Sequence, residues 1–236
     1  MVRCLVALLT ALLTLPASAQ RAADVLAAHA ACDGSLFRAL ALDAPRWRGE
    51  KSFRHKGKLA SFAVDSRQPP EGIGSPAMRD FRRARRFDAL PITGWFDADL
   101  SHWSRFARFE VGFLSWGFYI DASPADVRDT LIRHAPAIGR RITASSAQKP
   151  DVFCVQERWE TATGEAATGK VEGAHWQPVS CSADEDFPTE QVPMRWLVIR
   201  PFGDSGRSVL SCELAGKWTP EMLDALRPDL RAPGLK

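Results

Sequence analysis

The stretch RWLVIRPFGDSGRSVLSCEL, residues 195–214, decides the fold class of this 236-residue chain. Arg195–Pro201 and Ser208–Leu214 hold large apolar and β-branched residues, a composition typical of strands. Between them, Phe202–Arg207 contains two glycines, an aspartate and a serine, which favour a tight turn. The stretch therefore predicts a β-hairpin of two antiparallel strands.

Other stretches predict strands that extend this hairpin into a sheet. Phe106–Asp121 is rich in aromatic and β-branched residues, and Leu59–Asp65 predicts a short strand. Asp151–Glu160 and His175–Cys181 flank the small, polar residues 161–174, which predict a long hairpin loop.

Helices are expected before and between these strands. Residues 21–31 and 35–43 have the composition of helices. Three more helices are predicted where a hydroxyl residue precedes proline, because the hydroxyl caps a free amide and proline sets the first helical φ. These starts are Ser75-Pro76, Ser123-Pro124 and Thr219-Pro220, and the first helix is expected to run to about Phe87.

Together these elements predict the α+β class: a mostly antiparallel sheet of five to seven strands with helices packed on one face. We expect residues 20–230 to form a single domain, and a hydrophobic fraction of 45% is enough for a substantial core. Residues 231–236 predict a flexible tail.

Residues 1–19 predict a secretory signal peptide. Arg3 precedes the apolar run Cys4–Leu15, and Ala17-Ser18-Ala19 matches an Ala-x-Ala cleavage site. The apolar run is shorter than the roughly 20 residues that span a bilayer. We therefore expect cleavage after Ala19, a periplasmic protein of a Gram-negative bacterium, and no transmembrane segment in the mature chain.

Four cysteines lie beyond the predicted signal peptide, and an even number in an oxidising compartment favours two disulfides. If Glu160 faces His175 in the predicted hairpin, Cys154 faces Cys181 at a separation that suits a disulfide. Elimination then pairs Cys32 with Cys212. Free buried thiols remain the alternative, and the absence of closely spaced cysteine pairs excludes a four-cysteine zinc site.

Composition excludes several classes of function. The chain has 31 basic and 28 acidic residues, so its net charge of +3 gives no reason to expect a nucleic-acid partner. Its five histidines lack the i, i+4 spacing of a helical metal site. Asp97, Asp99 and His102 form a local polar group that we interpret as a capped loop before a helix rather than a cation site. We predict neither a metal nor a cofactor.

A run of arginines is the first candidate binding site. On the predicted helix, Arg79, Arg82, Arg83 and Arg86 share one face at i, i+3, i+4 and i+7. Such a guanidinium cluster suits phosphate, sulfate or the carboxylates of a partner. The alternative is a solvated helix face that is neutralised by acidic neighbours such as Asp80 and Asp88.

Tryptophans supply the second candidate. Nine aromatic residues fall between positions 95 and 119, and some of them must lie in the core. Because tryptophan is frequent at binding hot spots, Trp95, Trp103 and Trp116 are candidates for an exposed binding surface. Core packing is the alternative for all three.

Gly203-Asp204-Ser205-Gly206 resembles the nucleophile motif of trypsin-like serine proteases, and Ala27-Ala28-His29 is similar to the histidine motif of that family. The resemblance implies a nucleophilic Ser205 that is activated by His29. It covers about eight residues, and Arg207-Ser208 stands where that family has Gly-Pro. We therefore interpret the four residues as turn chemistry.

Without a catalytic, metal or cofactor motif, we predict a periplasmic, non-enzymatic binding or protein-interaction protein. A toxin-neutralising protein and an envelope accessory factor both fit this prediction. The alternatives are a serine hydrolase that uses Ser205, and a small-ligand carrier whose pocket lies between sheet and helices and is lined by tryptophans.

Overall fold

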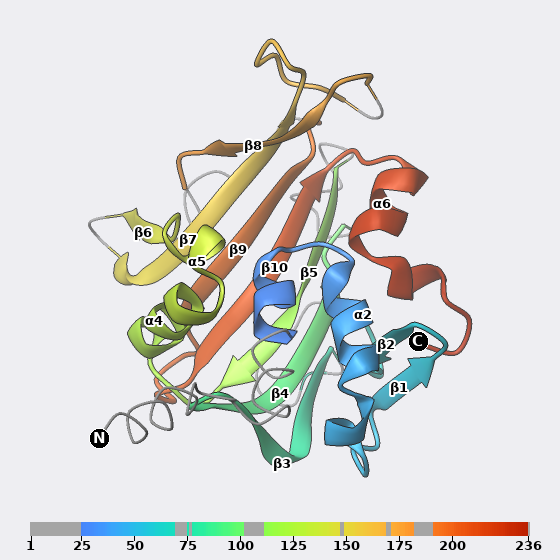
Figure 1. Ribbon diagram of the computed structural model, residues 1–236, viewed down its shortest axis with the longest axis vertical. Coiled ribbons are helices and arrows are strands. Elements are labelled where there is room, and N and C mark those ends of the chain that lie inside the picture. Colours follow the sequence, from blue (N-terminus) through green and yellow to red (C-terminus); the bar gives the residue numbers. More distant parts are fainter. Residues whose placement is uncertain are drawn as a thin grey trace, which may run out of the picture.

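The computed structural model describes residues 25–68, 75, 77–101, 111–146, 149–168, 171–181 and 191–235. Its centre is an antiparallel sheet, which Figure 1 shows face on. Along the sheet the strands are ordered β3 (Met78–Phe87), β4 (Leu90–Asp99), β5 (Gly112–Ile120), β10 (Ser208–Gly216), β9 (Met194–Pro201), β7 (Lys149–Glu160) and β6 (Thr143–Ser146). An eighth strand, β8 (His175–Val179), pairs with β7. The α+β class is confirmed, with eight strands rather than five to seven in this sheet.

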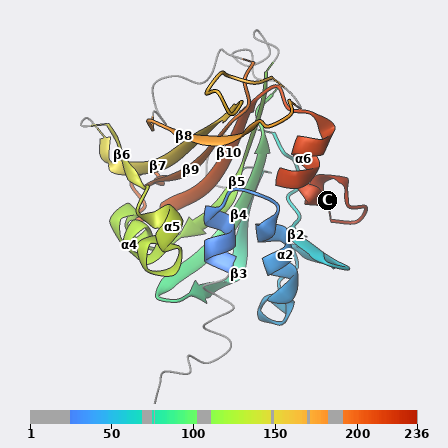
Figure 2. The same cartoon turned by 45° about the horizontal axis from the view of Figure 1, so that its top comes forward.

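The helices of the described chain lie on one side of this sheet, as predicted (Figure 1; Figure 2). They are α2 (Ser35–Leu42), α4 (Pro124–His134), α5 (Pro136–Gly139) and α6 (Pro220–Leu226), together with helical residues 25–30. Two short 3₁₀ segments, η1 (Ala44–Trp47) and η2 (Pro228–Arg231), follow α2 and α6. A separate hairpin of β1 (Phe53–Lys56) and β2 (Leu59–Phe62) lies beside α2.

Alternation along the strands divides the apolar residues between two faces of the sheet. On β5, Trp116 and Phe118 lie in the main core under the helices, whereas Phe113 and Tyr119 belong to smaller clusters on the opposite face. The face opposite the helices, called the far face below, is therefore partly apolar as well.

Both predicted hairpins are confirmed. Ser208 of β10 pairs with Pro201 of β9, and Gly203 and Gly206 in the turn have positive φ angles of 52° and 70°. Glu160 pairs with His175, so the predicted register of β7 and β8 is correct.

Both predicted disulfides are confirmed. Cys154 joins Cys181 with a Cα separation of 6.0 Å, which continues the β7–β8 register. Cys32 joins Cys212 with a Cα separation of 5.3 Å and ties the end of the first helical segment to β10. The Cys32–Cys212 bridge lies on the face of the sheet that the helices cover, and the Cys154–Cys181 bridge lies on the far face.

Two of the three predicted helix starts are confirmed. The Ser123 hydroxyl accepts a hydrogen bond from the Asp126 amide at 3.2 Å, and Thr219 caps α6 through the Met222 amide at 3.3 Å. The third prediction is wrong, because the residues that follow Ser75 form strand β3 instead of a helix. Pairing with β4 and burial of Phe81 and Phe87 outweigh the weak helical preference of an arginine-rich segment.

A fully buried ion cluster fixes the C-terminal segment to the sheet. The Arg227 guanidinium donates to both Asp97 carboxylate oxygens at 3.2 and 2.9 Å, and to Asp229 at 2.9 Å. Arg67 also donates to Asp97, at 2.9 Å. Burial acts to raise the pKa of the Asp97 carboxyl, but the charges of Arg227 and Arg67 outweigh it and lower that pKa.

This cluster explains part of the polar group expected at positions 97–102. Asp97 is an ion-pair partner inside the protein, and Asp99 accepts a hydrogen bond from the Ser101 amide at 3.0 Å, as a capped loop would require. His102 lies outside the described residues.

Candidate functional site

Strand β3 forms one edge of the sheet and contains a wide bulge. Asp80 pairs with Gly94 and Arg85 with Ile92, so four residues of β3 lie opposite one residue of β4. Within the bulge, Phe81 stays buried against Trp47, with ring centroids 5.2 Å apart. The next three residues, Arg82, Arg83 and Ala84, are all exposed. The bulge therefore directs consecutive side chains to solvent, which a regular strand would not do.

A second basic segment lies against this bulge. The buried Glu50 carboxylate accepts hydrogen bonds from the Arg82 amide at 3.1 Å and from the Ser52 hydroxyl at 2.8 Å. Arg46 donates to the carbonyl oxygen of Arg86 at 2.7 Å. These contacts place the chain around residues 46–52 beside β3, although more than 30 residues separate the two segments in sequence.

The Glu50 carboxylate, which connects the two segments by its hydrogen bonds, is ionised at neutral pH. Burial acts to raise the pKa of its carboxyl, but hydrogen bonds from Ser52 and from the Arg82 amide, with the charge of Arg85, together lower it. Glu50 is buried, and its two carboxylate oxygens accept hydrogen bonds from Ser52 and from the Arg82 amide, so it adds little negative charge to the exposed surface of the bulge.

The exposed cations of the two segments form one surface, which we call the basic edge. It consists of Arg48, Lys51, Arg82, Arg83 and Arg86. Among the residues that the structure describes, none of these five side chains forms an ion pair.

The acidic residues near the basic edge have other partners. Asp80 lies 3.8 Å from Arg207, and Asp88 lies 3.1 Å from His134. Asp43 pairs with Arg46 at 2.7 Å. The idea that Asp80 and Asp88 neutralise the arginine run is therefore not supported by their contacts.

The structure separates the residues that the sequence grouped together. Arg82, Arg83 and Arg86 belong to the basic edge, although they lie on a strand rather than on a helix face. Arg79 instead pairs with Asp65 at 2.6 Å. The acceptor Glu50 could not be recognised from sequence, because only the fold brings it to β3.

The prediction of an exposed tryptophan surface is wrong for two of its three residues. Trp95 and Trp116 are almost completely buried, with exposed fractions of 0% and 1%. Trp95 packs against Phe118 in the core, and the Trp116 ring lies 4.6 Å from the Arg227 guanidinium. Each lies on the strand face that the helices cover, so large apolar area is removed from water there. Trp103 lies outside the described residues.

Ser205 lies in the exposed β9–β10 turn. Its hydroxyl donates to the carbonyl oxygen of Phe202 and accepts from the Arg207 amide, as turn serines do. His29 is fully buried and bonds the Leu210 carbonyl oxygen at 3.1 Å, and burial lowers its pKa to about 4. These contacts indicate that Ser205 stabilises the turn, and they do not bring His29 to it as a base. They give the hydrolase alternative no support.

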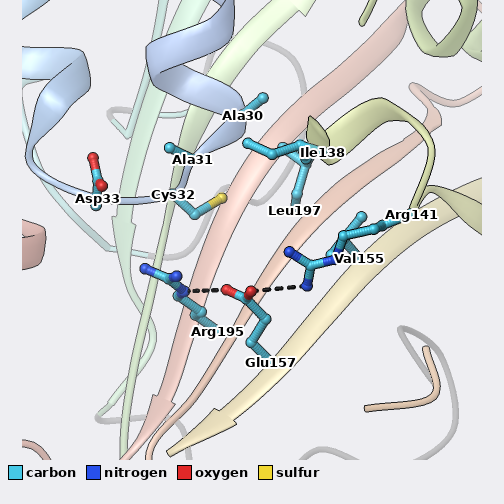
Figure 3. A pocket seen from close by; sticks show the side chains of 10 residues that line it. All are labelled: Ala30, Ala31, Cys32, Asp33, Ile138, Arg141, Val155, Glu157, Arg195 and Leu197. Carbon is cyan, nitrogen blue, oxygen red and sulfur yellow. Dashed lines mark hydrogen bonds and ion pairs between the residues drawn. The ribbon is translucent and has the colours of Figure 1, made fainter. Parts of the chain in front are cut away.

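A small cavity of about 230 Å³ lies on the helix-covered face, beside the Cys32–Cys212 bridge (Figure 3). Figure 3 shows the Glu157 carboxylate between two guanidinium groups: Arg195 donates to it at 2.6 Å and Arg141 at 2.8 Å. Burial acts to raise the pKa of the Glu157 carboxyl, but these arginines outweigh it and lower that pKa. A carboxylate held in this way stays ionised at neutral pH and does not serve as a general acid.

Glu157 should make stability depend on pH. Since its folded pKa is below the ordinary value of 4.5, its contribution is present above pH 4.5 and is lost as the pH falls through the folded pKa. Glu157→Gln should lower the free energy of unfolding by about 1–3 kcal/mol at pH 7, with the difference shrinking in acid. Urea titrations between pH 7 and pH 3 measure this. Exposed Glu172→Gln is the control, and an equal effect of both variants would contradict the assignment.

Comparisons of this chain with known protein families, with curated proteins and with solved structures found no match. In the described ranges, no helix is long and apolar enough to cross a membrane. Within the same ranges, no group of three or more His, Cys, Asp or Glu side chains is arranged to hold a metal ion.

Proposed function

We propose that this protein is a secreted, non-enzymatic binding protein that recognises an acidic protein partner through the basic edge. The observation that supports this most directly is the β3 bulge, which presents Arg82 and Arg83 together to solvent. Arginine binds carboxylates through paired N–H groups, and arginine is enriched among residues that dominate interface energies.

Charge complementarity is the basis for choosing an acidic partner. Like charges held together on one rigid surface repel one another, and this repulsion is relieved when carboxylates of a partner lie against them. The bulge also disrupts the regular edge of β3, which favours side-chain contacts over the addition of a partner strand.

The proposed location is the periplasm. The signal-peptide pattern at residues 1–19 supports export, and the two disulfides are compatible with an oxidising compartment. A protein that neutralises a secreted toxin and an envelope accessory factor are both consistent with an acidic partner in this compartment.

Capture with matched variants tests the proposal. Residues 20–236 and an Arg82→Gln, Arg83→Gln, Arg86→Gln variant would be immobilised, and a periplasmic extract of the source organism passed over both. A stoichiometric acidic partner should be retained by the unmodified chain alone. Purified, this partner should bind the variant at least 30-fold more weakly, with an affinity that falls as salt concentration rises.

The control carries the same loss of charge at a distance from the basic edge. Arg140→Gln, Lys149→Gln and Arg231→Gln together remove three exposed cations from the residue after α5, from β7 and from η2. This control should bind as the unmodified chain does. Equal retention of the same proteins by all three immobilised chains would refute the proposal.

A further inference from the structure

A second cavity lies on the far face of the sheet, and none of the residues that line it belongs to the basic edge. It has a volume of about 240 Å³ and lies over strands β4, β5, β9 and β10 and the start of β3, near the β9–β10 turn. Most of its lining is apolar and includes Met78, Phe96, Leu100, Phe202 and Val209. A cavity of this size holds a small molecule rather than a peptide.

The polar groups of this cavity are few. Ser115 is 4% exposed, and among the residues that the structure describes its buried hydroxyl has no hydrogen-bond partner. Buried hydroxyls are normally paired, and an unpaired one costs free energy. Ser115 lines the cavity, so a ligand atom that accepts a hydrogen bond there would satisfy this hydroxyl.

A cation lies on the same wall. Arg200 lines the cavity with its side chain 40% exposed, and one terminal nitrogen lies 3.2 Å from a carboxylate oxygen of Glu213. Glu213 is itself buried and accepts a hydrogen bond from Ser211 at 3.1 Å. Because a guanidinium has five N–H groups, Arg200 retains donors beyond its contact with Glu213.

Aromatic rings close the cavity toward the turn. Tyr119 packs against Phe202 with centroids 4.6 Å apart, and against Phe96 with centroids 5.4 Å apart. Arg207 lies over the Phe202 ring at 5.0 Å from its centroid. The wall is therefore suited to the face or edge of another aromatic ring.

We propose that this far-face cavity binds a small aromatic carboxylate, with its ring among Phe96, Tyr119 and Phe202 and its carboxylate within reach of Ser115 and Arg200. This site is separate from the basic edge, so it assigns a second binding activity that is independent of the acidic partner.

Titrations with two probes test this assignment by amide NMR on residues 20–236. Phenylacetate has the ring and a charged carboxylate, whereas benzyl alcohol has the ring and an uncharged hydroxyl. Phenylacetate should bind saturably and at least tenfold more tightly than benzyl alcohol, with shifts at β4, β5 and the β9–β10 turn. Ser115→Ala should weaken phenylacetate binding about tenfold, and Arg200→Gln should remove its advantage over benzyl alcohol.

Three further variants serve as controls: two lie outside the cavity, and one fills it. Ser61→Ala removes a buried serine from β2, and Arg231→Gln removes an arginine from η2, and neither should change binding. Val209→Phe fills the cavity and should abolish binding, with its spectrum confirming the fold. If phenylacetate does not saturate, or if Ser115→Ala and Arg200→Gln bind it as the unmodified chain does, the assignment is overturned.

Discussion

Replacing Arg227 by methionine should lower the free energy of unfolding by about 3–5 kcal/mol, the cost typical of leaving buried charges without their partner. The Arg227 side chain is completely buried and is the cation shared by Asp97 and Asp229. Methionine fills much of the same space but leaves the buried Asp97 and Asp229 carboxylates near each other, with Arg67 as the remaining cation beside Asp97. Urea unfolding at pH 7 measures the loss.

Arg231→Met is the matched control for this substitution. Arg231 lies in the same short segment and pairs with Asp224 at 2.8 Å, but both side chains are about half exposed. An exposed pair contributes at most about 1 kcal/mol. If both variants lose the same stability, burial does not determine the effect, and the cluster does not anchor the C-terminal segment.

Removing the Cys32–Cys212 bridge by a double substitution to alanine should lower stability by about 5 kcal/mol. In the chain-entropy account, the cost rises with the sequence separation of the two cysteines, here 180. The shorter Cys154–Cys181 bridge spans 27 residues, so its removal should cost about 3.5 kcal/mol.

The order of the two losses is the decisive outcome. Denaturant midpoints of both double variants, measured at equal protein concentration, give that order directly. A larger loss for the Cys154–Cys181 variant would contradict the expectation. It would show that local packing on the far face outweighs the entropy of the longer loop.

Much of the fold could be predicted because the relevant signals are local. The turn residues between β9 and β10 define a hairpin, and hydroxyl–proline pairs define the starts of α4 and α6. The register of β7 and β8 followed from one assumed pair and gave both disulfides. These predictions needed only the periodicity of strands and the chemistry of turns and caps.

The candidate sites depend on contacts that no local pattern contains. The spacing of the arginines between positions 79 and 86 fits a helix face, yet this segment forms strand β3 because it pairs with β4. The bulge in β3 then determines which of the arginines are exposed. Trp95 and Trp116 are buried because helices distant in sequence cover their face of the sheet. Ser115 gave no signal in the sequence, since its significance lies in a buried hydroxyl that has no partner in the described part of the chain.

The Cys32–Cys212 bridge has a topological consequence. It closes nearly the whole described chain into a covalent ring, and the Cys154–Cys181 bridge closes a smaller ring inside it. One backbone cut between residues 33 and 211 opens a ring without separating two pieces. A cut within the 161–174 loop opens both rings, and the two ends stay joined through both sulfur bridges. An extracellular protease that reaches that loop therefore nicks the molecule without releasing either part from the sheet.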